Sequence, residues 1–236
     1  MYLTRFRLNA ARTGARRLLA SPQRLHAAVM SSFPETPPSP DGGPRVLWRL
    51  DRDSSAEVVL YVAGPARPDL THLVEQAGWP TSEVQGWSTY DYGSFLAGLT
   101  ADSTWAFRLT ANPVHSIRRK EGEPTKRTAH VTPRHQIEWL LKQQESGGFA
   151  VVEKAVEKRR LERGDELELI VGGARSLSFN KGRALSESRN AVRITAVTYQ
   201  GRLRVTDPDV FRRKLVSGLG KAKAYGCGLM TLAPGR

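Results

Sequence analysis

The chain has 236 residues, of which 36 are lysine or arginine and 23 are aspartate or glutamate, so its formal charge at pH 7 is +13. Hydrophobic residues make up 39% of the chain, which excludes a disordered basic tail and fits one large domain or two small ones. The arginine excess indicates a polyanionic partner, with nucleic acid as the first candidate and simple solubility as the alternative.

The first half of the chain predicts the order β-α-β-β-α-β. Alternating polarity over residues 2–8 predicts a strand, and Ser21-Pro22 predicts the cap and first position of a helix over 22–32. A proline-rich loop is expected at 34–44. The remaining predicted elements are strands at 46–50, 58–62 and 105–109, a charged turn at 51–56 that leaves Asp51 in solvent, and a short helix at 69–76.

The second half is predicted to repeat this order after a basic, hydrophilic linker at 118–126. The predicted elements are strands at 127–131, 149–152, 167–171, 192–198 and 229–232, with helices opened by Thr132-Pro133 and Asp207-Pro208. A turn at Gln200-Gly201 is expected to precede a continuation of the fourth of these strands over 202–205.

The predicted fold class is therefore α+β, with two tandem ferredoxin-like (RRM-like, βαββαβ) domains over 1–117 and 127–236. The aromatic pattern of the RNA-recognition module is missing, so Tyr2, Phe6 and Trp105 are expected in the cores.

No sequence pattern predicts a metal ion or a cofactor. No two of the five histidines lie three or four residues apart on a predicted helix, and the single cysteine, Cys227, excludes an intrachain disulfide and a cysteine-based zinc site. Ala222 follows Gly220-Lys221 where a phosphate-binding loop needs Ser or Thr. No signal peptide or apolar run of about eighteen residues is present, so we expect a soluble, cytoplasmic protein without membrane contact.

The glycine-rich end of the chain is its most distinctive segment. Glycines at 218, 220, 226 and 228 surround Lys221 and Lys223. Glycine lets a backbone approach a phosphate closely, and lysine adds a compact positive charge. The segment therefore predicts a phosphodiester-binding loop, and the alternative is a tight turn with solvated lysines.

His26 is the candidate catalytic residue. It lies about 100° around the predicted helix from Leu25, on the flank of the apolar stripe, and is close in sequence to Arg16, Arg17 and Arg24. Nearby cations lower a histidine pKa and favour a neutral imidazole, which can take a proton from a ribose 2′-OH. An ordinary surface histidine is the alternative that these residues alone favour.

Motifs along nearly the whole chain resemble the CasE family, the CRISPR-associated endoribonucleases of type I-E systems that process precursor CRISPR RNA. FRLTANP at 107–113 and GLGKAKAYGCGLMTLAP at 218–234 are the most specific. The others are MYLTRFRL at 1–8, the Arg-Leu-His segment ending at His26, VLWRL at 46–50, IEWLLKQ at 137–143 and AVTYQGRLRVTDP at 196–208.

The resemblance implies that His26 is catalytic and that CRISPR repeat RNA is cut beside its stem-loop without a metal, leaving 2′,3′-cyclic phosphate and 5′-OH ends. It also implies that the protein stays bound to the crRNA stem-loop as a subunit of Cascade. Arg17 and Arg24 are the candidate cations for the scissile phosphate. The family often has a tyrosine three residues before the histidine, and here that position holds Gln23, which offers no phenol.

The expected RNA-binding residues are basic or belong to the glycine-rich loop. They are Arg16, Lys126, Arg127, Lys158, Arg159, Arg160, Arg163, Lys181, Arg183, Gly220, Lys221 and Lys223. By position, Ser178–Asn190 corresponds to a basic hairpin that enters the major groove of the stem in family members. For the basic run at 158–163, a solvated face is the alternative.

Two other functions stay open from the sequence. The first is a non-catalytic RNA-binding subunit on the same scaffold, which the missing tyrosine at Gln23 supports. The second is a ferredoxin-like enzyme with a small-molecule substrate, which needs a closed polar pocket and predicts binding that does not respond to salt.

Overall fold

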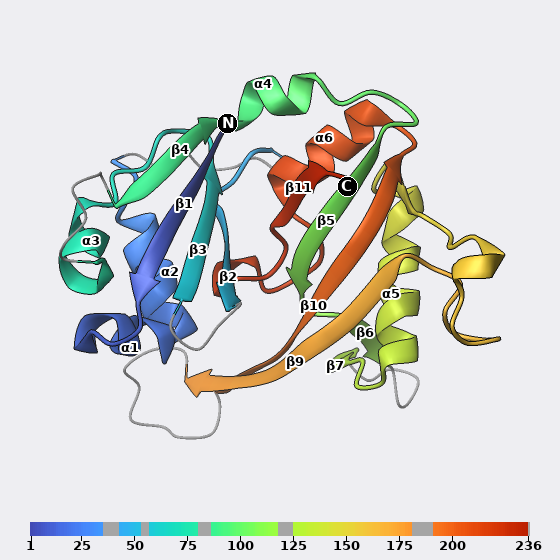
Figure 1. The fold of residues 1–236 in the computed structure, drawn as a ribbon. Helices are drawn as coiled ribbons and strands as arrows, with labels where there is room; N and C mark the ends of the chain where they lie inside the picture. The colour runs from blue at the N-terminus through green and yellow to red at the C-terminus, as the bar shows by residue number, and fades with distance from the viewer. Residues whose placement is uncertain (35–42, 53–56, 80–85, 118–124, 181–190, 236) are drawn as a thin grey trace. The chain divides into compact units, whose positions relative to one another are not determined.

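The computed structural model describes all residues except 35–42, 53–56, 80–85, 118–124, 181–190 and 236 (Figure 1). The predicted loop at 34–44, turn at 51–56, linker at 118–126 and hairpin tip within 178–190 fall wholly or partly outside the described residues. The chain forms two compact units, the first comprising Met1–Leu99, Arg212–Leu219 and Lys223–Leu229, and the second Thr100–Phe211, Gly220–Ala222 and Met230–Arg236.

The first unit contains an antiparallel sheet in the order β2-β3-β1-β4. Its strands are β1 (Tyr2–Asn9), β2 (Leu47–Arg52), β3 (Glu57–Gly64) and β4 (Trp87–Asp91). The helices are α1 (Thr13–Leu19) and α2 (Pro22–Met30) before β2, α3 (Thr71–Ala77) before β4, and α4 (Tyr92–Ala97) after it. This connectivity and strand order are those of a ferredoxin-like domain.

The core of the first unit places α2 firmly on its sheet. Leu25 and Val29 of α2 are buried in one cluster with Phe6 and Leu8 of β1 and Leu60 of β3. Apolar residues four apart lie on the same face of a helix, so this contact fixes which face α2 turns away from the core.

The second unit contains a sheet in the order β11-β5-β10-β8, with β9 also paired to β10. Its strands are β5 (Thr104–Ala111), β8 (Phe149–Val151), β9 (Leu169–Asn180), β10 (Ala191–Val205) and β11 (Met230–Pro234). The helix α5 (Pro133–Glu145) follows β5, and α6 (Pro208–Ser217) follows β10 (Figure 1). The strand order again matches a ferredoxin-like domain, so the predicted fold class is confirmed.

Three shorter features complete the chain. A two-stranded hairpin of β6 (Val114–Ile117) and β7 (Lys126–Ala129) is inserted between β5 and α5. Two 3-10 turns are η1 (Val156–Lys158) and η2 (Lys223–Tyr225). No helix among the described residues has the length and apolar character that crossing a membrane requires.

The predicted division of the chain assigns two strands wrongly. The strand at 105–109 is the first strand of the second sheet, because β5 pairs with β10 and β11. The fourth strand of the first sheet is β4, and the strand predicted at 127–131 belongs to the inserted hairpin. The expected boundary at 118–126 therefore falls inside the second unit, which begins at Thr100.

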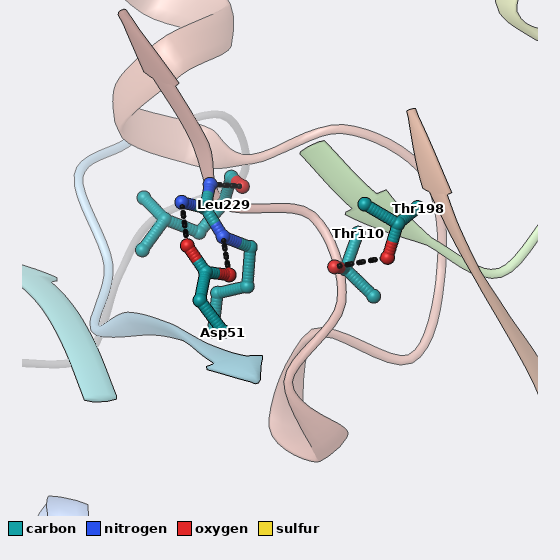
Figure 2. A network of polar contacts seen from close by, with 5 residues as sticks. Asp51, Thr110, Thr198 and Leu229 are labelled. Carbon is teal, nitrogen blue, oxygen red and sulfur yellow. Dashed lines mark hydrogen bonds and ion pairs between the residues drawn. The ribbon is translucent and has the colours of Figure 1, made fainter. Parts of the chain in front are cut away.

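Two local predictions are also wrong. Gln200-Gly201 is not a turn, because β10 runs straight through it, and a Cβ on Gly201 would lie 2.1 Å from the carbonyl oxygen of Glu168. Glycine is needed there for close backbone approach. Asp51 is not in solvent: only 5% exposed, it forms a buried ion pair with Arg49 (Figure 2).

Candidate active site

Helix α2 holds His26 at the edge of the core of the first unit. The helix begins as the sequence predicts, with Pro22 in its first turn and the backbone N–H of Arg24 donating to Ser21 Oγ at 3.3 Å. Because Leu25 and Val29 are buried, the neighbouring His26 lies on the flank of the buried face, and its side chain is half-buried. The predicted position of His26 is therefore confirmed.

The imidazole of His26 contacts an indole from the sheet. Nε1 of Trp48, on β2, donates to Nδ1 of His26 at 3.4 Å. Burial lowers the pKa of His26 below its ordinary value of 6.5, which favours the neutral ring at neutral pH. The predicted direction is right, but the predicted cause is wrong, since desolvation and not neighbouring cations lowers the pKa.

The end of the glycine-rich segment packs next to this histidine helix. Within the first unit, η2 lies against both α2 and β2. Lys223 Nζ donates to the backbone oxygen of Ser217 at 2.6 Å, and the N–H of Leu219 donates to the oxygen of Gly228 at 3.0 Å. Lys223 is thus held by the backbone of its own loop and is not a freely solvated lysine, whereas Lys221, in the second unit, is exposed.

The two candidate catalytic arginines differ in their placement. Arg17 is exposed on α1, a helix that packs against α2. Arg24 is exposed on α2 itself, but it lies two positions before His26, so it projects about 200° around the helix from the imidazole. Gln23, three residues before His26, is exposed and shares the face of the histidine. The structure records no contact between either arginine and His26 among the described residues.

The expected RNA-binding residues of the first unit are Arg16 and Lys223. Arg16 is exposed, and its guanidinium donates to the oxygen of Ala11 at 2.8 Å and to Thr13 Oγ1 at 3.2 Å. These bonds fix the guanidinium beside the start of α1.

The expected RNA-binding residues of the second unit are spread over several elements. Lys126 and Arg127 lie on β7, and Lys158 is the last residue of η1. Gly220 and Lys221 belong to the glycine-rich segment. The backbone of Lys221 forms an isolated antiparallel β-bridge with that of Asn112. Lys181 and Arg183 lie outside the described residues.

Part of the basic run at 158–163 is held by an acidic residue. Asp165 forms an ion pair with Lys154 and accepts the backbone N–H of Arg160 at 2.6 Å. Arg159 Nε donates to the oxygen of Lys154 at 3.2 Å. Lys158, Arg160 and Arg163 keep exposed side chains. The backbone of the run is thus held in place while these three side chains are exposed. This arrangement is compatible with both predictions for the run, an RNA-binding surface and a solvated face.

Sequence reasoning missed Trp48. It lies in the VLWRL segment, but no spacing rule links position 48 to position 26, because the contact joins a strand to a helix across 22 residues. The only available signal was the indole N–H of Trp48 itself. A buried indole N–H requires a hydrogen-bond acceptor, which predicts a polar neighbour but does not identify it.

Comparison with known proteins identifies the family to which this chain belongs. A family model described as CRISPR associated protein matches residues 1–234. The curated CRISPR-associated endoribonuclease Cse3 of Thermus thermophilus is 29% identical over 235 residues, covering 99% of this chain and 100% of that protein. The chain therefore belongs to the family of CRISPR-associated proteins, with the CasE (Cse3) proteins that its motifs resemble.

Solved structures agree with this placement. Thermus thermophilus Cse3 bound to an RNA representing a pre-cleavage complex is 30% identical, with a TM-score of 0.73 and coverage of 99% of this chain and 98% of that chain. A Cse3 endoribonuclease bound to a 19-nucleotide RNA is 27% identical, with a TM-score of 0.72 and coverage of 99% and 100%. Cas6e of Escherichia coli, at 20% identity, 99% and 100% coverage and a TM-score of 0.57, shares the fold.

Proposed function

We propose that this protein is an endoribonuclease that cuts CRISPR repeat RNA beside its stem-loop and needs no metal ion. His26 carries the chemistry, the products have 2′,3′-cyclic phosphate and 5′-OH ends, and the protein stays bound to the crRNA stem-loop as a Cascade subunit. The observation that supports the proposal best is the half-buried imidazole of His26, kept neutral by burial at the edge of the core. The similarity to an endoribonuclease along the whole chain supports the substrate.

The proposed reaction is an internal transesterification. The ribose 2′-oxygen forms a bond to phosphorus while the bond from phosphorus to the 5′-oxygen breaks. One proton leaves the 2′-OH and another reaches the 5′-oxygen, and His26 serves one of these transfers as general base or acid. The phosphate oxygens gain negative charge on the way, so cations aimed at them lower the barrier.

Arg17, Arg24 and Lys223 are the proposed sources of that positive charge. Arg17 and Lys223 stand on elements that pack against α2, namely α1 and η2. Arg24 projects to nearly the opposite side of α2 from His26. We therefore rank Arg17 and Lys223 before Arg24 as partners of His26 at the phosphate.

Binding of the RNA stem is proposed for the basic residues of both units. An A-form stem presents mainly phosphates and 2′-hydroxyls, so distributed positive charge contributes most of the affinity. Arg16 in the first unit and Arg127, Lys158, Arg163 and Lys221 in the second expose their side chains and are suited to this role.

The test is a His26→Ala variant in the presence of EDTA. Cleavage of the repeat is expected to slow by about 10²–10⁴-fold, because a positioned proton-transfer group contributes about that factor. Binding of a repeat with a 2′-deoxy nucleotide at the cut position should not change. His135→Ala, which removes an exposed histidine of α5, is the matched control and should cut normally.

The second candidate function is a non-catalytic RNA-binding subunit. The exposed Gln23 on the face of His26 favours it, because no phenol is available there. Tight binding of the repeat by the unaltered protein with no cleavage would support this alternative, and undiminished cleavage by His26→Ala would refute the assignment of His26.

A further inference from the structure

The hydrogen bond between Trp48 and His26 indicates a role for Trp48 that no sequence motif predicts. We propose that Trp48 is a positioning residue of the active site: its indole N–H binds Nδ1 of His26 and holds the neutral ring in the tautomer that carries its proton on Nε2. This inference rests on the proposed function of His26 and adds the group that sets the state of its ring.

The direction of the hydrogen bond decides the tautomer. An indole nitrogen only donates, so Nδ1 of His26, 3.4 Å from Trp48 Nε1, must accept and carries no proton. A neutral imidazole then has its proton on Nε2. Among the described residues none hydrogen-bonds to Nε2, and the His26 side chain is half-buried, so Nε2–H remains available as a donor on this part of the chain.

The glycine-rich segment holds the indole in place. Trp48 is only 2% exposed, and its strand lies against η2. Gly226, which directly follows η2, has φ of +80°, and a Cβ built on it would lie 2.7 Å from Cζ3 of Trp48. Any larger residue would be strained in this backbone conformation and would also collide with the indole. Both the positive φ and the close approach to Trp48 therefore require glycine at position 226.

The contact has two chemical consequences. Protonation of His26 would put an N–H on Nδ1 against the N–H of Trp48, so the contact and burial both disfavour the charged ring. In the neutral ring, Nε2–H can donate a hydrogen bond to an oxygen that gains negative charge, such as the leaving 5′-oxygen or a phosphate oxygen, but it is too weak an acid to be transferred. Of the two proton transfers, this arrangement favours donation to the 5′-oxygen by the protonated ring, because Nε2 carries a proton in both states and cannot accept one from the 2′-OH.

The test measures the ring of His26 directly in the free, full-length protein. Nitrogen NMR of histidine-labelled protein should show His26 with its proton on Nε2 and a lowered pKa. In Trp48→Phe the ring should become a mixture of tautomers, and its pKa should rise because the opposing N–H is gone. Repeat cleavage should slow by about tenfold, less than on loss of His26 itself. In the pH dependence of the cleavage rate, the transition that reflects titration of His26 should shift to higher pH by as much as the pKa measured by NMR.

Two further variants keep the result interpretable. Replacement of Trp48 by β-(3-benzothienyl)alanine keeps the shape of the ring but puts sulfur in place of the N–H, so it separates the hydrogen bond from packing. Trp105→Phe is the matched control, because it removes an indole bond to Ser103 Oγ of 3.1 Å in the second unit. It should leave the tautomer and pKa of His26 unchanged.

The outcomes separate this inference from the proposed function. If both Trp48 replacements leave the tautomer and pKa of His26 as they are, Trp48 is only a packing residue and the inference fails. That result would not affect the proposed function, which depends on whether His26→Ala still cuts the repeat.

Discussion

At the scale of single residues, the most consequential interaction outside the candidate site is the buried ion pair of β2. Arg49, 1% exposed, donates from Nε and Nη2 to the two carboxylate oxygens of Asp51 at 2.7 and 2.8 Å. Its Nη1 donates to the oxygen of Leu229 at 3.2 Å (Figure 2). Its guanidinium also lies 5.2 Å from the ring centroid of Tyr61. Within the first unit, this arginine ties β2 to the end of the glycine-rich segment.

Asp51→Ala should therefore destabilise the protein strongly. Removal of the carboxylate leaves the Arg49 guanidinium buried without its counter-ion, which costs about 3–5 kcal/mol in the free energy of unfolding. Urea denaturation gives this value. Glu138→Ala is the control, because its partner Arg134 is 86% exposed at the side chain and an exposed pair contributes at most about 1 kcal/mol. Equal losses in the two variants would contradict the argument.

The sequence predicted His26 but not its surroundings, for a physical reason. Helical spacing places a residue relative to the core, and Leu25 and Val29 are enough to put His26 on the flank of α2. Spacing does not report which strand faces that flank, so Trp48 was missed. It also does not report burial of the ring itself, so the lowered pKa was attributed to neighbouring arginines.

At the scale of elements, strong local signals predicted most of the fold. The alternation in β1, the Ser21-Pro22 start of α2 and the Asp207-Pro208 start of α6 are all where the sequence indicates. The missed elements lack such signals: α1 has no side-chain cap, and β4 is a short strand without a buried residue. Because the sequence does not predict β4, it places the strand at 105–109 fourth in the first sheet, although β5 belongs to the second. Periodicity could not correct this error, since strand pairing depends on long-range contacts.

The inserted hairpin brings together three histidines that are far apart in the sequence. The ring centroids of His115, on β6, and His130, just after β7, are 4.4 Å apart, and those of His130 and His135, on α5, are 5.8 Å apart. Within the described ranges, no group of three or more His, Cys, Asp or Glu side chains has the geometry to hold a metal ion. Burial, then His115, His135 and Lys142, lower the pKa of His130 below 6.5, and Glu138 opposes them.

This cluster should make the protein sensitive to acid. Because the pKa of His130 is lower in the folded state, the unfolded chain binds more protons once the pH falls below about 6.5. Stability contributed by the neutral ring is present above that pH and decreases as the pH approaches the folded pKa. His130→Gln should therefore lose less stability than the unaltered protein between about pH 7.5 and 5.5. Thermal unfolding across this range measures it, and parallel curves would contradict it.

At the scale of the whole molecule, the charge of +13 is distributed over both units and is not confined to one segment. Arg16 and Arg17 are exposed in the first unit, and Arg127, Lys158 and Arg163 are exposed in the second. The buried core residues of both units are mostly apolar, and these cations lie outside the cores. A surface of this kind attracts a polyanion over distances of about a Debye length and is weakened by salt.

Binding of the repeat RNA should therefore weaken steeply with salt. Each phosphate neutralised by a lysine or arginine releases counter-ions, so the logarithm of the binding constant falls linearly with the logarithm of salt concentration. Lys158→Ala and Arg163→Ala should each weaken binding and reduce that slope by about 1 if their side chains contact phosphates. Arg134→Ala removes an exposed arginine that is paired with Glu138, and it should change neither quantity.

Filter binding of a 2′-deoxy-blocked repeat, measured between about 50 and 200 mM salt, separates the possible functions. A slope near zero would favour a small-molecule enzyme over an RNA-binding protein. A steep slope that neither Lys158→Ala nor Arg163→Ala changes would show that the basic run at 158–163 is a solvated face, and that RNA binding depends on the other exposed cations, such as Arg16, Arg127 and Lys221.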